Sequence, residues 1–363
     1  MIIGVPREIK AGEGRVALTP DTVQALVAAG NVLRVQAGAG AAAGFADSAY
    51  AKAGAELVAS AAQSFDAELV VKVKEIQDGE WQHLRAGGML FSFLHLGADH
   101  AMARALLNRR ITGIAFETVV DKDGGLPILA PMSALAGELA PSIAARLQGR
   151  SGATSLRDVA VLIVGAGAAG SAAARAAIAL GARVTIVAQS DRRLAPLRAE
   201  FGAAIRTVTM AGINLPKQAR ETEVLIAAIN VAGAATPKLL TRQDIAGMRA
   251  GAVLIEICID GGGIAETSHP TTLAAPSYVE EGVIHYCVPN MPAGTPRVAS
   301  EKLAAALLPY LQSLTEQGLL RAMRDNEGLA AGLQMHGGSI TQREVAAQLG
   351  LPFLDLDAVL FSC

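Results

Sequence analysis

The stretch VAVLIVGAGAAGSAAARAAIALGARVTIV, residues 159–187, decides the fold of this chain. It begins with the apolar run 159–164, passes through a glycine-containing turn at 165–170 and continues into an alanine-rich helical segment. A second apolar run follows at 184–187. A G-x-G-x-x-G turn between a strand and a helix is typical of a dinucleotide-binding site, so we expect a βαβ unit that binds a nucleotide here.

Each residue of this turn has a separate physical role in such a site. Gly165 permits the tight turn, Gly167 lets a pyrophosphate approach the backbone, and Gly170 allows the helix to pack closely on the strand. Ala168 and Ala169 begin the helix, whose N-terminus favours anionic phosphates. Because the chain is rich in alanine and glycine, a turn that serves packing alone is the alternative.

A second glycine-rich stretch, AGAGAAAGF at residues 37–45, also follows an apolar run. The spacing of Gly38, Gly40 and Gly44 is one residue too long for the dinucleotide pattern. No clean apolar helix follows it. We therefore expect a structural turn at this position.

Short β-type runs alternate with helical segments along almost the whole chain. The first series lies at 2–5, 32–35, 69–73, 89–93 and 112–116, and the second at 159–164, 184–187, 224–228, 253–259 and 283–288. Segments 133–150 and 298–323 are helical in pattern. A helix is also expected from Pro20 to Gly30, with Thr19 as its N-cap. This alternation predicts an α/β fold with parallel sheets, and the length of 363 residues suggests two domains, each a Rossmann-like βαβ unit.

Composition excludes several classes of function. The 31 Lys and Arg against 33 Asp and Glu leave a net charge of −2, which gives no footprint for nucleic acid or an anionic membrane. No apolar stretch reaches the ~18 residues of a membrane span without glycines or charges. The start, MIIGVPREIK, lacks the apolar core of a signal peptide, so we expect a cytoplasmic protein. Histidines and cysteines have no metal-ligand spacing, so no metal is expected.

Polar residues follow several of the expected strands. In parallel sheets, ligands bind beyond the carboxyl ends of the strands. The residues at these positions are Lys74, His95, Glu117, Asp260 and Asn290. Because they come from both domains, they predict one cleft between the domains.

Each of these polar residues also has a simpler explanation. A solvated strand-end side chain accounts for Glu117 equally well. His95 lies between Leu94 and Leu96, so we expect it to be half-buried and able to titrate near neutral pH. Asp260 precedes three glycines that leave room for a ligand. Arg15, in a glycine-rich loop, is either a solubilising residue or a bidentate clamp for a substrate carboxylate.

The end of the second strand of the dinucleotide unit bears on the choice of cofactor. It reads Ala188, Gln189, Ser190. An acidic residue is expected there to bind the ribose hydroxyls of NAD(H). Without this acidic residue, a 2′-phosphate would not be repelled. Ser190 with Arg192 or Arg193 could bind that phosphate, so NADP(H) is slightly favoured. In the alternative, both arginines are solvated and Asp191 replaces the missing acid.

Taken together, blocks along nearly the whole chain resemble the alanine dehydrogenase family, which shares its fold with the soluble NAD-binding part of proton-translocating transhydrogenase. These blocks are GVPREIKAGEGRVALTP, AGAGAAAGFADSAYAKAGA, LVVKVKE, FLHLGAD, GIAFET, PILAPMSALAGELA, the GAGAAG turn, PTTLAAPSY and HYCVPNMPAGTPR. Transhydrogenase is the poorer match, because KVKE and FLHLGAD follow the dehydrogenase pattern and no membrane segment follows.

The resemblance implies roles for individual residues. Arg15 would hold the substrate carboxylate, and Lys74 would contact the carboxylate or the carbonyl oxygen. His95 and Asp260 would handle protons as ammonia leaves and water adds. The residues that would lie against the cofactor are Ser133, Asn290 and the turn from Gly165 to Gly170.

The resemblance also implies a domain arrangement and an assembly. The cofactor domain, residues 128–296, would be inserted into a substrate domain formed by 1–127 and 297–363. The enzyme would be a homo-oligomer, often a hexamer.

Three departures from the family pattern bear on the substrate and the cofactor. Ala188 stands where the family has an acidic residue, and Gly261 stands where a Gln is expected. The loop GRSGATSLRD at 149–158 is shorter than usual and lacks its proline. These changes around retained catalytic residues suggest an altered substrate or cofactor preference.

The functional hypothesis is an oxidoreductase that catalyses the reversible NAD(P)-dependent oxidative deamination of L-alanine, or a similarly small amino acid, to the 2-oxo acid and ammonia. One alternative is an imine-reducing or opine-type dehydrogenase that uses a larger amine. The other is a non-catalytic dinucleotide-binding protein or a transhydrogenase-like soluble subunit, against which the presence of both His95 and Asp260 argues.

Overall fold

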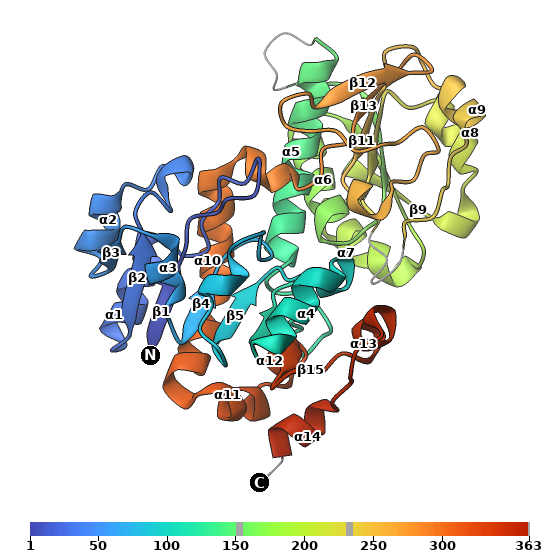
Figure 1. Cartoon of the computed structure of the whole chain (residues 1–363). Coiled ribbons are helices and arrows are strands. Elements are labelled where there is room, and N and C mark those ends of the chain that lie inside the picture. The colour runs from blue at the N-terminus through green and yellow to red at the C-terminus, as the bar shows by residue number, and fades with distance from the viewer. Residues whose placement is uncertain (150–154, 230–234, 362–363) are drawn as a thin grey trace. The chain divides into compact units, whose positions relative to one another are not determined.

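The computed structural model describes residues 1–149, 155–229 and 235–361. Residues 150–154 of the GRSGATSLRD loop and Cys363 lie outside these ranges. The chain divides into two compact units, Met1–Pro131 with Thr295–Cys363 and Met132–Gly294. Figure 1 shows a sheet with helices in each unit, as the alternation of runs predicts. The α/β fold with two mostly parallel sheets is therefore confirmed.

The sheet of the first unit has eight strands in the order β15-β14-β6-β5-β4-β1-β2-β3. Six of them are parallel: β1 (Ile2–Val5), β2 (Val32–Gln36), β3 (Glu56–Val58), β4 (Leu69–Val71), β5 (Met89–Ser92) and β6 (Thr112–Ala115). The late strands β14 (Leu333–His336) and β15 (Ser339–Ile340) add antiparallel pairs beside β6. The end of the chain thus completes the sheet that its beginning starts.

Helices of the first unit connect these strands. They are α1 (Pro20–Ala28), α2 (Asp47–Lys52), α3 (Ala61–Phe65), α4 (His100–Asn108), α10 (Pro296–Gln317), α11 (Leu319–Asp325), α12 (Glu327–Ala330), α13 (Arg343–Leu349) and α14 (Leu356–Phe361). The helix expected over 298–323 is two helices, because Gly318 between them has φ of 75° and breaks the first. Thr19 is the N-cap residue of α1, but its hydroxyl bonds to Thr22 Oγ1 at 3.1 Å and makes no capping bond.

The sheet of the second unit has seven strands in the order β12-β13-β11-β10-β7-β8-β9. The strands are β7 (Ala160–Val164), β8 (Arg183–Ala188), β9 (Ile205–Thr209), β10 (Val224–Ala227), β11 (Val253–Glu256), β12 (Ser277–Glu280) and β13 (Val283–Tyr286). Only β12 pairs in an antiparallel manner among the described strands of this sheet. The helices are α5 (Ala130–Leu147), α6 (Ala168–Ala179), α7 (Asp191–Phe201), α8 (Leu215–Arg220) and α9 (Arg242–Ala246).

The two sheets share one strand order. Numbered along each unit, the parallel strands run 3-2-1-4-5-6, which is the doubly wound dinucleotide-binding order. Successive connections leave the first and fourth strands on opposite sides, and ligands bind beyond the carboxyl ends at this switch point. The switch points lie between β1 and β4 in the first unit and between β7 and β10 in the second.

Burial follows from this architecture. The central strands β10 and β11 are buried at every residue, as expected for parallel strands covered on both faces. The glycine-rich stretch at 37–45 is a structural turn, as predicted, because a side chain at Gly40 would overlap with the ring of Tyr50. Among the residues that the structure describes, no helix is long and apolar enough to cross a membrane.

Candidate active site

Arg15 lies in the loop that leaves β1, on one side of the first switch point. Its guanidinium forms a bidentate pair with Glu13, with Nε to Oε1 at 2.8 Å and Nη2 to Oε2 at 2.6 Å. The Arg15 side chain is only 2% exposed, which excludes a merely solubilising role. Burial opposes ionisation of Glu13, but the hydrogen bonds and charge of Arg15 hold the pKa of this carboxyl below its usual value.

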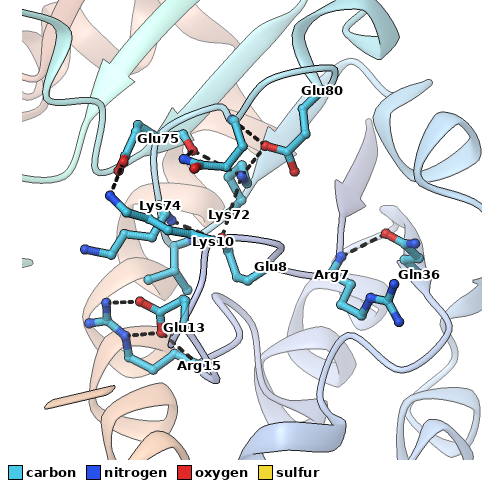
Figure 2. A network of polar contacts seen from close by, with 12 residues as sticks. Arg7, Glu8, Lys10, Glu13, Arg15, Gln36, Lys72, Lys74, Glu75 and Glu80 are labelled. Atoms are coloured by element: carbon cyan, nitrogen blue, oxygen red, sulfur yellow. Dashed lines mark hydrogen bonds and ion pairs between the residues drawn. The ribbon is translucent and has the colours of Figure 1, made fainter. Parts of the chain in front are cut away.

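Lys74 lies in the loop that leaves β4, on the other side of the same switch point. Burial, and then the positive charge of Arg15, lower the pKa of its ammonium. Figure 2 shows the Lys74 ammonium and the Arg15 guanidinium on the same side of a network of polar contacts. The fold therefore brings together two cations, separated by 59 positions in the sequence, at the place where it predicts a ligand.

His95 follows β5 and adopts the left-handed conformation, with φ of 43°. Its backbone N–H donates to Glu117 Oε1 at 2.7 Å, and its Nδ1 lies 3.8 Å from the same oxygen. The ring stacks on Phe93 with centroids 6.1 Å apart. Backbone strain in a non-glycine residue is common at functional sites, so the conformation fits a working side chain.

The side chain of His95 is about half-buried, as expected from its neighbours. It is 51% exposed, whereas both neighbours, Leu94 and Leu96, are buried. Glu117 is not a solvated strand end, because its carboxylate also accepts the N–H of Leu94 at 3.2 Å.

In the second unit, the glycines of the turn meet three different surroundings. Gly165 has φ of 115°, and a side chain there would overlap with the carbonyl oxygen of Ala228 at the end of β10. A Cβ on Gly170 would overlap with the carbonyl oxygen of Gly165. A Cβ on Gly167 would have no atom of the described residues within 4 Å. The turn thus packs through its outer glycines and leaves open space at the central one, where the N-terminus of α6 begins.

Ser133 and Asn290 lie in this unit as well. Ser133 is in the first turn of α5, four residues before Gly137, so the two share a helix face. Gly137 packs against the carbonyl of Ala169 in the glycine turn. Asn290 follows β13 with φ of 55°. Helix periodicity therefore places Ser133 on the side of α5 that faces the turn.

The end of β8 presents a carboxylate-free surface. Ala188 is buried, whereas Gln189 and Ser190 are exposed. Ser190 precedes α7 without a side-chain capping bond. Asp191 is engaged in a bidentate pair with Arg198, with both N···O distances at 2.7 Å.

Two arginines lie just beyond. Within the described ranges, no ion pair or side-chain hydrogen bond holds Arg192 or Arg193. They are therefore available for a ligand, whereas the carboxylate of Asp191 is already paired.

Asp260 lies in a short 3₁₀ turn, Ile259–Gly261, and is exposed. The strand before it ends earlier than expected, at Glu256, because that buried carboxylate binds the returning loop. Its Oε1 accepts the N–H of Ile264 at 2.8 Å and the hydroxyl of Ser268 at 2.7 Å. Its Oε2 accepts from Cys258 Sγ at 3.3 Å. Glu256 thus folds the chain back so that Asp260 lies at the tip of the loop.

Three site residues were not predicted from the sequence. Glu8, Glu13 and Glu256 are buried acids that hold loops rather than strand-end side chains. The sequence did contain a signal for Glu13, since it lies two residues from Arg15 in the same glycine-rich loop.

Among residues 1–149, 155–229 and 235–361, no group of three or more His, Cys, Asp or Glu residues is arranged to hold a metal ion.

Comparison with known families shows to which family this chain belongs. Residues 4–136 match the model of the N-terminal domain of alanine dehydrogenase/PNT, and residues 144–343 match that of the C-terminal domain. The chain belongs to the alanine dehydrogenase family. An alanine dehydrogenase of Halomonas elongata is 42% identical over 99% of this chain and 100% of the relative. That of Mycobacterium tuberculosis H37Rv is 41% identical over the same shares.

Solved structures of the family agree. An L-alanine dehydrogenase superposes with a TM-score of 0.91 at 36% identity, covering 96% of this chain and 99% of the other. A transhydrogenase from Sinorhizobium meliloti, at 22% identity, superposes with a TM-score of 0.84 over 95% of this chain and 100% of the other, which shows a shared fold. As a member of the alanine dehydrogenase family, the chain is an amino-acid dehydrogenase that uses a nicotinamide dinucleotide. The open space at Gly167 and the helix N-terminus beside it fit the pyrophosphate of that cofactor.

Proposed function

We propose that this protein catalyses the reversible oxidative deamination of L-alanine to pyruvate and ammonia. The observation that carries the proposal is the pair of cations, Arg15 and Lys74, at the switch point of the first unit. An α-carboxylate is the common group of an amino acid and a 2-oxo acid, and two adjacent cations bind it in both directions of the reaction.

Residues of this chain have distinct roles in the proposed reaction. Arg15 binds the carboxylate, and Glu13 holds the guanidinium in place. Lys74 contacts the carboxylate or the carbonyl oxygen, where its positive charge stabilises developing negative charge. A bound nicotinamide supplies the acceptor for the α-hydrogen, which leaves as hydride and gives an imine.

Hydrolysis of that imine requires proton transfer in two steps. Water loses a proton as it attacks the imine carbon, and the amine gains one before ammonia leaves. His95 and Asp260 are our proposed groups for these transfers. The imidazole Nδ1 lies 3.8 Å from Glu117 Oε1, so the carboxylate can orient the ring.

For the cofactor we propose binding at the second switch point. The pyrophosphate lies on the turn from Gly165 to Gly170, with Ala168 and Ala169 at the helix N-terminus. Ser133 and Asn290 are proposed to contact the cofactor. NADP(H) is favoured over NAD(H), because Ala188 removes the acid at the end of β8 and Asp191 is paired with Arg198. Ser190 and Arg193, beside Gln189, are then the proposed contacts of the 2′-phosphate.

The proposed reaction is tested by mixing pyruvate, ammonia and reduced cofactor with the enzyme. We expect cofactor oxidation that requires both substrates. Asp260→Asn should bind the cofactor normally and lose turnover, because binding does not need a proton donor at that position. Absence of turnover across a panel of 2-oxo acids would contradict the proposal. Turnover with organic amines but not with ammonia would instead indicate the opine-type alternative.

Cofactor preference is tested by fluorescence titration with NADPH and NADH. We expect tighter binding of NADPH, and we expect Arg193→Ala to weaken NADPH binding while leaving NADH binding unchanged. Stronger binding of NADH by the unmodified enzyme would overturn this preference. The homo-oligomeric assembly and the cytoplasmic location stay predictions.

A further inference from the structure

Glu8 connects the two loops of the first switch point. It lies three residues beyond β1, and its side chain is 3% exposed. Its Oε1 accepts the backbone N–H of Val73 at 2.6 Å and that of Lys74 at 3.4 Å. These amides belong to the segment that leaves β4, the neighbour of β1 in the sheet. One buried carboxylate therefore fastens the loop after β1 to the backbone of the loop after β4.

The second oxygen of Glu8 faces a buried cation. Lys72 Nζ lies 3.6 Å from Glu8 Oε2, and the Lys72 side chain is fully buried. The same ammonium donates to Glu80 Oε2 at 2.6 Å and to the carbonyl of Glu75 at 3.3 Å. Glu80 Oε2 also accepts the N–H of Gln77 at 2.7 Å. Residues 72–80 are thus held at both ends by one buried cluster, Glu8, Lys72 and Glu80, which Figure 2 shows beside Lys74.

Lys74 itself is held only through its main chain. Neighbouring carboxylates have other cations, since Glu75 pairs with Lys10 and Glu13 pairs with Arg15. In the described part of the chain, no carboxylate lies within ion-pair distance of Lys74 Nζ. The loop is therefore fixed while the ammonium is left for a ligand.

We propose that Glu8 is a positioning residue, whose carboxylate, paired with Lys72, holds the Lys74 loop so that the Lys74 ammonium stands beside Arg15 and binds the substrate carboxylate. This inference rests on the proposed function. It adds a role for a residue that does not touch the substrate and acts only through the backbone of Val73 and Lys74.

Folding stability alone does not explain the buried cluster of Glu8, Lys72 and Glu80. Burying charges is costly, and well-packed apolar side chains commonly serve folding as well or better. Glu8 Oε2 makes no hydrogen bond in the structure, so part of this cost is not offset. A geometric requirement explains why a carboxylate stands there, because only an acceptor can bind the amides of Val73 and Lys74 at once while facing Lys72.

The test compares Glu8→Gln and Glu8→Ala with Glu68→Gln as the matched control. Glu68 accepts the N–H of Ile2 at 2.7 Å at the opposite end of the same strands, so its replacement makes the same chemical change at a similar bond far from the switch point. Glu8→Gln keeps the side-chain volume and one oxygen that can accept the amide N–H bonds. The group that faces Lys72 is then an uncharged amide instead of a carboxylate. Glu8→Ala removes both contacts; if that variant fails to fold, Glu8→Gln carries the comparison.

Two measurements separate positioning from a structural role. Amide hydrogen exchange of the peptide that covers 72–80 should be faster in Glu8→Gln than in the unmodified enzyme, and unchanged in Glu68→Gln. In the assay with pyruvate and ammonia, KM for pyruvate should rise about tenfold in Glu8→Gln while kcat changes less than about threefold, because ground-state and transition-state binding are lost together. NADPH affinity should not change.

Each outcome bears on one of the two proposals. Exchange at 72–80 that is unchanged in Glu8→Gln overturns the positioning role, whatever the activity. Faster exchange with an unchanged KM also overturns it, because the loop would then not present Lys74 to the substrate. If the unmodified enzyme shows no turnover, the proposed function fails, and the exchange comparison still decides whether Glu8 holds the loop.

Discussion

Gly167 and Gly170 lie three positions apart in one turn, yet their surroundings are opposite. The space beyond Gly167 is open, whereas Gly170 lies directly against the carbonyl of Gly165. A dinucleotide-binding turn needs both properties, because one glycine admits the ligand and the other closes the packing between strand and helix. A turn that served packing alone would have no reason to leave Gly167 uncovered.

Alanine substitution at these two glycines should therefore have different effects. Gly170→Ala forces backbone to shift, so we expect a loss of about 1–3 kcal/mol in the free energy of unfolding. Gly167→Ala should cost about 1 kcal/mol or less, as for an alanine at an N-cap, but should weaken NADPH binding about tenfold or more. Urea unfolding and fluorescence titration measure the two effects. Unchanged NADPH affinity in Gly167→Ala would show that the pyrophosphate does not approach there.

Glu8 predicts a pH dependence of stability. Burial raises the pKa of the Glu8 carboxyl from 4.5 to about 7. The charge of Lys72 and the hydrogen bond from the Val73 amide lower this pKa, whereas the negative charges of Glu13 and Glu80 raise it further. Between these two pKa values the folded protein keeps a proton that the unfolded chain has lost, so the carboxylate form that pairs with Lys72 is the one present above about pH 7. The contribution of Glu8 to stability is thus present below about pH 4.5, falls as pH rises, and is lost above about pH 7.

Thermal unfolding of Glu8→Gln between pH 5 and pH 8 tests this dependence. Because Gln does not titrate, the melting temperature of the unmodified protein minus that of the variant should fall by several degrees over this interval. Glu68→Gln, measured in parallel, controls for replacing a carboxylate by an amide elsewhere on the same strands. A difference that stays flat or grows with pH for Glu8→Gln would mean that Glu8 is ionised throughout.

At the scale of elements, α5 and α6 approach closely enough at Gly137 for backbone to contact backbone. A Cβ on Gly137 of α5 would overlap with the carbonyl oxygen of Ala169, in the first turn of α6. This close approach places the N-terminus of α6, and with it the phosphate-binding end of the turn, against α5. The glycine is retained although it costs helix stability relative to alanine.

Gly137→Ala should therefore weaken cofactor binding. Alanine gains about 1 kcal/mol of helix propensity, but the overlap with Ala169 requires a shift of the helix N-terminus. We expect a net loss of stability and NADPH binding that is weaker by about tenfold, with KM for pyruvate unchanged. Ala134→Gly, on the same helix, is the control for the effect of helix propensity on stability. Gly149→Ala cannot serve as a control, because Gly149 has a positive φ that alanine disfavours. A fully stable Gly137→Ala with normal affinity would refute this role of the contact.

Elements with strong local signals were predictable. All ten apolar runs contain strands. Arg15, Lys74 and the turn from Gly165 to Gly170 follow strands at the two switch points. The strands β3, β9 and β12 were missed, because they are short or partly exposed edge elements without an apolar run. The antiparallel pairs at β12, β14 and β15 were likewise not expected. Their pairing depends on tertiary contacts rather than on local pattern.

Long-range polar contacts were beyond reach for the same reason. Glu8 and Val73 are 65 positions apart, and no periodicity links a carboxylate to an amide at that separation. The left-handed backbone of His95 is signalled by neither Leu94 nor Leu96. The early end of β11 depends on Glu256 binding Ile264 and Ser268. Sequence thus located the loops, whereas the buried acids that shape them appear only in the folded chain.

At the scale of the whole molecule, one strand order occurs in two units for which we propose different ligands. Both units have the 3-2-1-4-5-6 order, and each has some of its candidate residues at the switch point. In the first unit this point has the cations Arg15 and Lys74, and in the second it has the uncharged turn of Gly165. A carboxylate needs counter-charges, whereas a pyrophosphate is bound by backbone N–H groups at a helix N-terminus. The same architecture is therefore specialised by loop residues alone.

This division predicts that each ligand protects its own unit from hydrogen exchange. NADPH alone at about 100 times its Kd stabilises the protein by about 2.7 kcal/mol, so protection should be measurable. We expect it in the peptides that cover 165–171 and 188–193, and expect Gly167→Ala to lose it. A 2-oxo acid added with the cofactor should protect 8–15 and 72–75, and Arg15→Ala should abolish only this second effect. A bound ligand lowers hydrogen exchange most at the amides that it covers. If NADPH alone gave the strongest protection at 8–15 and 72–75, the assignment of ligands to the two switch points would be reversed.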